Sequence, residues 1–208
     1  MAQAQRLIVG ITGASGIIYG VRFLEVLKDT PIETHLVMSQ SAEVTLAYES
    51  NLKVAQIKDL ADVVYSNGDI GAAISSGSFH TMGMVIAPCS IRSASEIATG
   101  VTSTLLTRAA DVVLKERRRL VLLLRESPLH TGHLRTLTHL SEIGAVISPP
   151  VPAFYANPES INDIVNHTIG RALDMFSVHS DLVRRWGEPD GAGKLPRKRT
   201  KKRVSSKV

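Results

Sequence analysis

The chain has 208 residues, 44% of them hydrophobic, which is enough for one domain with a buried core. Its apolar runs are too short to span a membrane, so we expect a cytoplasmic protein. A single cysteine, Cys89, excludes an intramolecular disulfide framework and a Cys-X-X-Cys metal site. The net charge of +5 is concentrated at the end of the chain, since residues 188–208 hold eight Lys or Arg against two acids and leave residues 1–187 at −1.

Short apolar segments alternate along the chain with segments whose apolar residues recur at helical spacing. This alternation predicts βαβ units and a three-layer α/β/α parallel sheet of the flavodoxin-like, or Rossmann-like, class. We expect strands over residues 6–12, 33–39, 63–65, 82–87, 120–124 and 145–148. We expect helices over residues 17–27, 40–49, 93–99, 103–116, 131–143 and 158–176.

A glycine-rich turn, residues 13–16, follows the first strand. Small residues there let backbone amides at the start of the next helix approach a phosphate, and Thr12 and Ser15 add hydroxyl donors. A plain tight turn is the alternative, because any strand-helix unit benefits from glycine here. The second strand ends at Ser39 and not at the acid that a dinucleotide site uses to hold a ribose. The pattern therefore favours a mononucleotide, FMN, over NAD.

A second candidate region is the helix over residues 103–116 and the apolar strand that follows it. Arg108 and Lys115 are seven residues apart and therefore project from one face of the helix, and the strand ends directly on Arg125 and Glu126. Ligands bind at the carboxyl edge of parallel sheets, and cationic side chains there suit an anionic, phosphorylated ligand. The plainer alternatives are a solvated helix face for the cations, and a salt bridge or helix cap for Glu126.

Segments in order along the chain resemble the UbiX-type flavin prenyltransferases, a family whose members are also known as components of phenolic acid decarboxylases. The resemblance covers about residues 7–186. It implies a homo-oligomer, commonly a dodecamer, that binds reduced FMN and joins a dimethylallyl group from dimethylallyl phosphate to N5 and C6 of the flavin. It also implies that the prenylated FMN serves a separate UbiD-type decarboxylase. The matching segments are residues 13–16, 33–39, 74–79, 88–90, 108–116 and 150–155.

The resemblance assigns site residues by their positions in these segments. The implied FMN contacts are Gly13, Ala14, Ser15, Ser39, Ser90, Ile91, Arg92, Ser93 and Arg125. The implied contacts of the prenyl donor are Tyr155 and Arg171, with Arg108 and Lys115 nearby or supplied by a neighbouring copy of the chain, and Trp186 as a wall of the prenyl pocket. Ser15, Glu49, Lys115 and Glu126 are the implied catalytic residues.

These residue types suit the cleavage of an allylic carbon–oxygen bond. Arg171 and Lys115 can neutralise the departing phosphate, and Tyr155 can donate a hydrogen bond to it. Glu126 can accept the ring proton that is lost from C6, with Ser15 and the phosphate as relays. With these cations we expect no metal ion, and the chain has no Asp-Asp-X-X-Asp or His-Glu-X-X-His motif. We assign no role to Cys89.

Three other interpretations stay open at this point. A flavin-dependent cysteine decarboxylase of related fold would need a different loop at residues 88–92 and a catalytic histidine. A noncatalytic FMN carrier, or an accessory subunit of an aromatic acid decarboxylase, is a second alternative. The basic segment 188–208 contains no aromatic residues, so a disordered, solvated tail is favoured over one that binds nucleic acid or a membrane surface.

Overall fold

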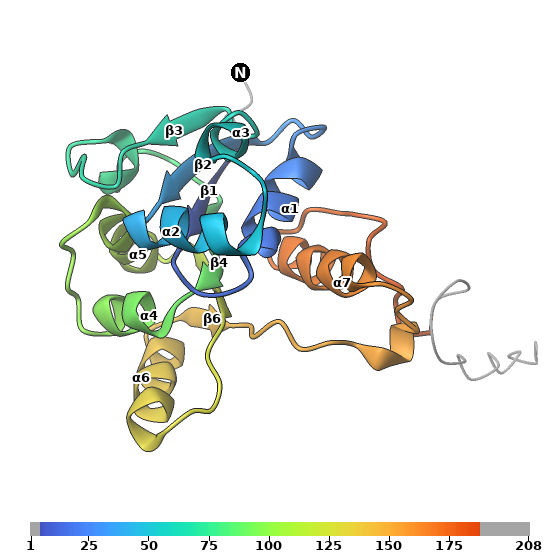
Figure 1. Ribbon diagram of the computed structural model, residues 1–208. Coiled ribbons are helices and arrows are strands. Elements are labelled where there is room, and N and C mark those ends of the chain that lie inside the picture. Colours follow the sequence, from blue (N-terminus) through green and yellow to red (C-terminus); the bar gives the residue numbers. More distant parts are fainter. Residues whose placement is uncertain (1–4, 188–208) are drawn as a thin grey trace, which may run out of the picture.

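The computed structural model describes residues 5–187, in which one parallel sheet lies between two layers of helices. Its strands are β1 (Arg6–Ile11), β2 (Glu33–Met38), β3 (Val63–Tyr65), β4 (Gly83–Cys89), β5 (Arg119–Leu124) and β6 (Ala145–Ile147). All pairings are parallel, and the order across the sheet is β3-β2-β1-β4-β5-β6 (Figure 1). The central strands read as continuous apolar runs because both of their faces are buried.

The helices lie on both faces of this sheet. They are α1 (Ile17–Leu27), α2 (Gln40–Glu49), α3 (Val54–Lys58), α4 (Ile91–Ala98), α5 (Leu105–Lys115), α6 (Thr131–Glu142) and α7 (Ile161–Asp174). Alternate side chains of β1 enter two separate cores: Leu7 and Val9 pack with α1 and α7, and Ile8 packs with α4, α5 and α6. Figure 1 shows α7 beside α1, with α4, α5 and α6 on the other side of the sheet.

Three helices begin at other residues than the sequence predicts, because a hydroxyl side chain caps each of them. The Thr104 side chain caps α5, which begins at Leu105 and not at residue 103. The Ser90 side chain caps α4, which therefore begins at Ile91 and not at residue 93. The Ser160 side chain caps α7, which begins at Ile161 and not at residue 158. The short helix α3 is an addition to the predicted elements.

The order in which strands are added to the sheet reverses between β1 and β4: β2 and β3 extend it on one side, and β5 and β6 on the other. The strands β1 and β4 are neighbours, but α1 after β1 and α4 after β4 pack into different cores. A crevice therefore opens at their carboxyl ends, which is where ligands bind in doubly wound sheets. The predicted three-layer α/β/α sheet is confirmed, with the strand order of the Rossmann type. β4 continues through Pro88 to Cys89, past its predicted end at residue 87.

After β6 the chain leaves the sheet. The segment 148–160 runs outward, passes through a short 3₁₀ turn (Phe154–Ala156), and returns as α7 (Figure 1). A hydrogen bond of 2.8 Å from Arg22 Nε to Asn166 Oδ1 joins α7 to α1. Within residues 5–187 no helix is long and apolar enough to cross a bilayer. The predicted basic tail, residues 188–208, lies outside the described residues.

Candidate active site

A cavity of about 330 Å³ lies at the carboxyl ends of β1, β2 and β4. The amino ends of α2, α4 and α5 border it, so their partial positive charges face the same space. A second cavity of about 350 Å³ lies beside α7, so size alone does not identify the site. The lining of the first cavity is Gly13, Ser39, Gln40, Ser41, Asn67, Ser90, Arg92, Ser93, Glu96, Thr104, Leu106 and Thr107.

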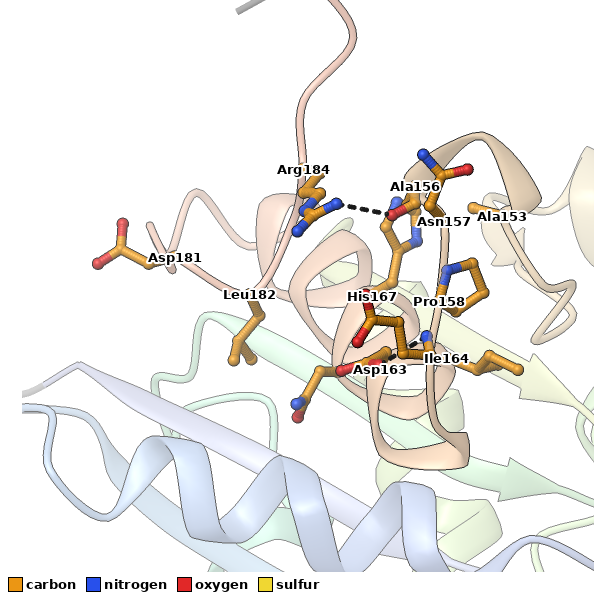
Figure 2. A pocket seen from close by; sticks show the side chains of 12 residues that line it. Ala153, Ala156, Asn157, Pro158, Asp163, Ile164, His167, Asp181, Leu182 and Arg184 are labelled. Carbon is orange, nitrogen blue, oxygen red and sulfur yellow. Dashed lines mark hydrogen bonds between the residues drawn. The ribbon is translucent and has the colours of Figure 1, made fainter. Parts of the chain in front are cut away.

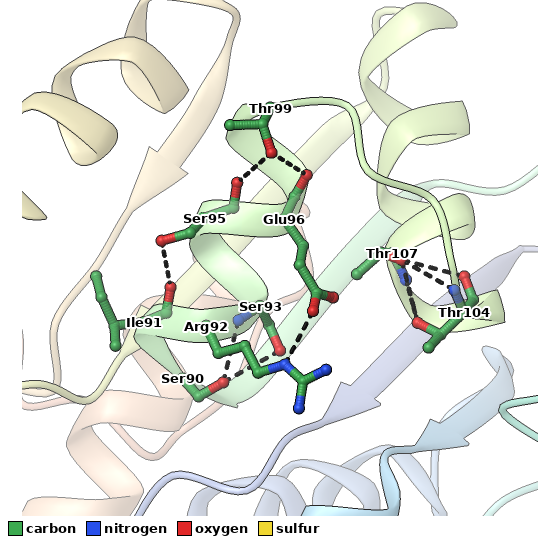
Figure 3. A network of polar contacts seen from close by, with 9 residues as sticks. All are labelled: Ser90, Ile91, Arg92, Ser93, Ser95, Glu96, Thr99, Thr104 and Thr107. Carbon is green, nitrogen blue, oxygen red and sulfur yellow. Dashed lines mark hydrogen bonds and ion pairs between the residues drawn. The ribbon is translucent and has the colours of Figure 1, made fainter.

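Hydroxyl groups dominate one wall of this cavity (Figure 3). Ser90 Oγ accepts a hydrogen bond from the Ser93 amide at 3.2 Å and donates to Ser93 Oγ at 3.1 Å. Arg92 Nε pairs with Glu96 Oε1 at 2.9 Å, and most of the Arg92 side chain is exposed. Thr104 caps α5 from the facing side. Hydroxyls and helix amino ends are the donor set that a phosphate and sugar hydroxyls require, so this cavity fits the phosphate and ribityl parts of FMN.

Thr12 ties the glycine-rich turn to the loop after β4. Its hydroxyl is fully buried, donates to the Pro88 carbonyl at 2.7 Å and accepts from the Ser90 amide at 2.8 Å. The prediction that Thr12 donates to a phosphate is therefore wrong, because its proton is already used inside the fold. Its role is to hold two walls of the crevice together.

The buried hydroxyl of Thr12 gives a stability prediction. Thr12→Val keeps the shape but leaves the Pro88 carbonyl and the Ser90 amide without this partner, so we expect a loss of about 1–3 kcal/mol in the free energy of unfolding. Urea denaturation followed by circular dichroism measures it. Thr138→Val is the matched control, because Thr138 is exposed on α6, and we expect its effect to stay within about 0.5 kcal/mol. Equal stabilities of the two variants would contradict the assigned role.

Glu49 closes the amino end of α1. Its carboxylate accepts hydrogen bonds from the backbone amides of Gly16 at 2.9 Å and Ile17 at 3.0 Å, and from the Ser15 hydroxyl. Desolvation favours the neutral acid, but these hydrogen bonds and the charge of Arg125 outweigh it and lower the pKa of Glu49. Glu49 is therefore ionised at neutral pH. The expectation that these first amides of α1 face a phosphate is wrong, because they are bound to this carboxylate.

Arg125 and Glu126 leave β5 beside the glycine-rich turn. The Arg125 amide bonds to the Cys89 carbonyl at 2.9 Å, and its Nε donates to the Ser15 carbonyl at 3.3 Å. Glu126 Oε1 accepts from the Ser127 amide at 3.1 Å. The alternative that Glu126 caps the next helix is wrong, because the His130 ring caps α6. Ser15, Glu49 and Arg125 thus form one cluster at the carboxyl edge, with Glu126 next in sequence.

Arg108 and Lys115 lie on one face of α5, as their spacing predicts, and this face turns to residues 75–77. Arg108 Nε donates to the Ser75 carbonyl at 3.3 Å, and Lys115 pairs with Glu116. Lys115 ends α5 just before β5 begins, so it lies toward the amino edge of the sheet, opposite the crevice. The expectation that it joins Arg125 at the strand exit is wrong within one chain. A role of Lys115 in the reaction requires a second copy.

The predicted contacts of the prenyl donor form a third group. The rings of Tyr155 and Trp186 meet edge to face with centroids 5.5 Å apart, next to His167 on α7. Arg171 NH1 pairs with Asp174 Oδ2 at 2.7 Å one turn further along α7. Figure 1 shows that this end of α7 and the segment 148–160 lie to one side of the sheet. The structure therefore brings Tyr155 and Trp186 together, but no hydrogen bond or ring contact within residues 5–187 joins them to Arg125.

The comparisons with known proteins identify the family. Residues 1–173 match the Flavoprotein family. Flavin prenyltransferase UbiX of Escherichia coli K12 is 60% identical over 185 residues, which are 88% of this chain and 98% of that protein. The chain belongs to the UbiX family of flavin prenyltransferases.

Solved structures of UbiX-type proteins have the same architecture. AnUbiX (PadA1), crystallised in complex with FMN and dimethylallyl pyrophosphate, has a TM-score of 0.87 and 44% identity, covering 88% of this chain and 98% of that one. The dodecameric FMN-dependent UbiX-like decarboxylase of Escherichia coli O157:H7 has a TM-score of 0.86 and 46% identity, covering 88% and 99%. The resemblance found in the sequence is thereby confirmed.

Two side chains of this UbiX-family chain that could suggest further chemistry have structural roles. Cys89 is fully buried, and desolvation raises its thiol pKa to about 12, which makes it an apolar filler without nucleophilic character. His130 uses Nδ1 to accept hydrogen bonds from the first amides of α6, so that nitrogen serves as a helix cap. Among residues 5–187, no three His, Cys, Asp or Glu side chains are grouped so as to hold a metal ion.

Several residues of the UbiX-type site carry no signal in the sequence alone. Asn67 accepts hydrogen bonds from the first two amides of α5 at 2.9 and 3.1 Å, and so fixes the wall that holds Thr104 and Thr107. In the sequence only its place before Gly68 marks it. His167 contacts the Tyr155 hydroxyl, but a histidine within a helical segment has no distinctive spacing. These residues become visible only when loops and helices from distant parts of the chain are placed together.

Proposed function

We propose that this protein is a flavin prenyltransferase that binds reduced FMN in the crevice between β1 and β4 and transfers to it a dimethylallyl group from dimethylallyl phosphate. The observation that carries the proposal is the joining of two features at one sheet edge. The first is the hydroxyl-lined cavity with three helix amino ends, and the second is the cluster of Ser15, Glu49 and Arg125 beside it. Its 60% identity to a curated flavin prenyltransferase supports the same activity.

The flavin, when bound, supplies the electron-rich N5 and C6 atoms that accept the dimethylallyl group. Ser39, Ser90 and Ser93 would hold its phosphate and ribityl hydroxyls, together with the turn at residues 13–15. Arg125 would donate to the ring; in support, its guanidinium reaches from the end of β5 to the Ser15 carbonyl in the glycine-rich turn. Ile91 and Arg92 are the proposed contacts at the start of α4.

The chain's own residues would carry the charge and proton movements. Arg171, Lys115 and Arg108 would neutralise the phosphate as the carbon–oxygen bond breaks, and Tyr155 would donate a hydrogen bond to it. Glu126 would be the final acceptor of the proton lost from C6, with the Ser15 hydroxyl and the phosphate as relays between the two. Trp186 would wall off the allyl group from water.

Mass spectrometry of the flavin tests this activity. We expect the protein, reduced FMN and dimethylallyl phosphate, mixed without oxygen, to give a flavin heavier by one prenyl unit. Parallel reactions with dimethylallyl pyrophosphate and with oxidised FMN establish the preferred donor and the need for the reduced ring. If the flavin binds but keeps its mass with both donors, the result contradicts the transferase proposal and favours a noncatalytic FMN carrier.

The placement of Lys115 leads us to propose that the site is completed between copies in a homo-oligomer, and that this oligomer is a dodecamer. Co-assembly of Lys115→Ala subunits with Glu126→Gln subunits should then restore activity, because sites with Glu126 from one copy and Lys115 from another are intact. An equal mixture would recover roughly a quarter of the sites. The control mixes Lys115→Ala with Arg108→Ala, which damage the same α5 face and should not complement. No recovery in the first mixture would place Lys115 outside the site.

We further propose that the product serves a separate UbiD-type decarboxylase of aromatic acids. Prenylated FMN is a modified cofactor, and the enzyme that makes it does not need it for its own reaction, so another enzyme must use it. Adding the reaction mixture to a flavin-free decarboxylase of that type should start carbon dioxide release, and a mixture made without the prenyl donor should not. Decarboxylation by this protein alone would instead make it the decarboxylase.

A further inference from the structure

Three aromatic side chains meet where the segment 148–160 passes α7. The Tyr155 hydroxyl lies 3.2 Å from His167 Nε2, and the two rings stand edge to face at 83° with centroids 5.7 Å apart. Trp186 packs on the Tyr155 ring at 84°. Tyr155 stays 43% exposed, so its hydroxyl can reach a ligand while it is held from behind.

His167 belongs to the more firmly held of the two segments. Asn166, the preceding residue on α7, bonds to Arg22 of α1, and Val165 and Ile169 are buried in the core of that face. Figure 2 shows His167 on α7 beside the chain at residues 156–158, where Arg184 also bonds to the Ala156 carbonyl at 3.3 Å. A hydrogen bond from this helix therefore fixes the direction of a side chain on an outlying segment.

The direction of the bond follows from proton counting. A tyrosine hydroxyl has one proton, and a phosphate ester offers acceptor oxygens to it. If Tyr155 donated that proton to His167, it would turn lone pairs toward the phosphate and repel it. We propose that His167 is a positioning residue whose Nε2–H donates to the Tyr155 oxygen, so that Tyr155 keeps its proton for the phosphate of the prenyl donor. This inference rests on the proposed function, which places Tyr155 at that phosphate.

The charge state of His167 agrees with this role. Desolvation and the positive charge of Arg171 lower its pKa, against a smaller opposing effect of Asp174. The ring is therefore neutral at neutral pH and carries one N–H, which the bond to Tyr155 would fix at Nε2. A neutral donor orients the hydroxyl without adding a charge to the site.

Calorimetric titration of dimethylallyl phosphate into the oligomeric protein tests the role without depending on turnover. We expect Tyr155→Phe and His167→Leu each to bind the donor about three- to tenfold more weakly than the wild type, which is the effect of one hydrogen bond. His167→Gln keeps an N–H donor and should bind within about twofold of the wild type. The double variant, Tyr155→Phe with His167→Leu, should bind no more weakly than Tyr155→Phe alone, because His167 acts through the hydroxyl.

Two results would overturn the inference: wild-type affinity in His167→Leu, or a further loss when His167→Leu is added to Tyr155→Phe. A further loss in the double variant would show that His167 acts by packing. If His167→Leu fails to fold, His167→Gln is compared with the wild type instead, and a tenfold loss of donor affinity in His167→Gln would contradict the role. His139→Leu is the matched control, an exposed histidine on α6 whose loss should not change affinity. If the wild type prenylates FMN and His167→Leu binds the donor with normal affinity, only this inference is refuted. If the wild type neither binds the donor nor prenylates FMN, the proposed function is refuted as well.

Discussion

Replacing Glu126 with glutamine is expected to slow the formation of prenylated FMN by about 10²- to 10⁴-fold, the usual contribution of a general base. The carboxylate follows Arg125 at the exit of β5, where the crevice begins, and the amide of glutamine cannot take a proton from C6. Single-turnover measurements of prenylated flavin, with the protein in excess over FMN and dimethylallyl phosphate at saturation, would isolate this step. FMN affinity should stay unchanged, because Glu126 is not among the proposed flavin contacts.

A matched exchange separates this effect from a general change in charge. Glu142→Gln removes the same charge from an exposed position at the end of α6 and should leave the rate unchanged. If Glu126→Gln reacted within about threefold of the wild type, the base would have to be another carboxylate. Glu49 is the next in position, but it is held ionised by three donors, which makes it a weaker base than a free carboxylate.

The fold was predictable because its signal is local. Strands such as β5, with residues 120–124 buried, read as unbroken apolar runs, and a parallel sheet follows from the alternation of such runs with helices. Apart from the end of β4 and the short helix α3, the errors are at helix starts, which one capping side chain determines. Ser90 and Ser160 override the expected starts at residues 93 and 158, since a cap satisfies amides that the apolar pattern does not reveal.

The site was predictable only in part, because its residues come from distant segments. Gly13, Ser39 and Ser90 follow strands directly, so strand prediction alone puts them at one edge. Glu49 ends a helix, and its bond to Gly16 spans 33 residues of sequence, so only the family resemblance suggested it. Lys115 could have been placed correctly from the sequence: a helix that ends at about residue 116, directly before a parallel strand, ends at the amino edge of the sheet, opposite Arg125.

Replacing Gly13 with alanine is expected to weaken FMN binding by about 10- to 100-fold, the cost of forcing a methyl group into a packed contact. An added Cβ would lie 2.3 Å from Ser41 Cβ and 2.9 Å from the Ser41 carbonyl carbon, so the turn and the start of α2 would have to separate. Both line the proposed phosphate cavity. Titration of FMN fluorescence measures the affinity.

Gly71→Ala is the control, because there the added Cβ meets only Asp69 Oδ1 at 3.6 Å, an ordinary contact. It should bind FMN like the wild type. The two variants together distinguish a loss of binding at the crevice from a general cost of removing glycine. Wild-type affinity in Gly13→Ala would mean that the flavin phosphate does not depend on the spacing between this turn and α2, and would move its site away from the β1–β4 crevice.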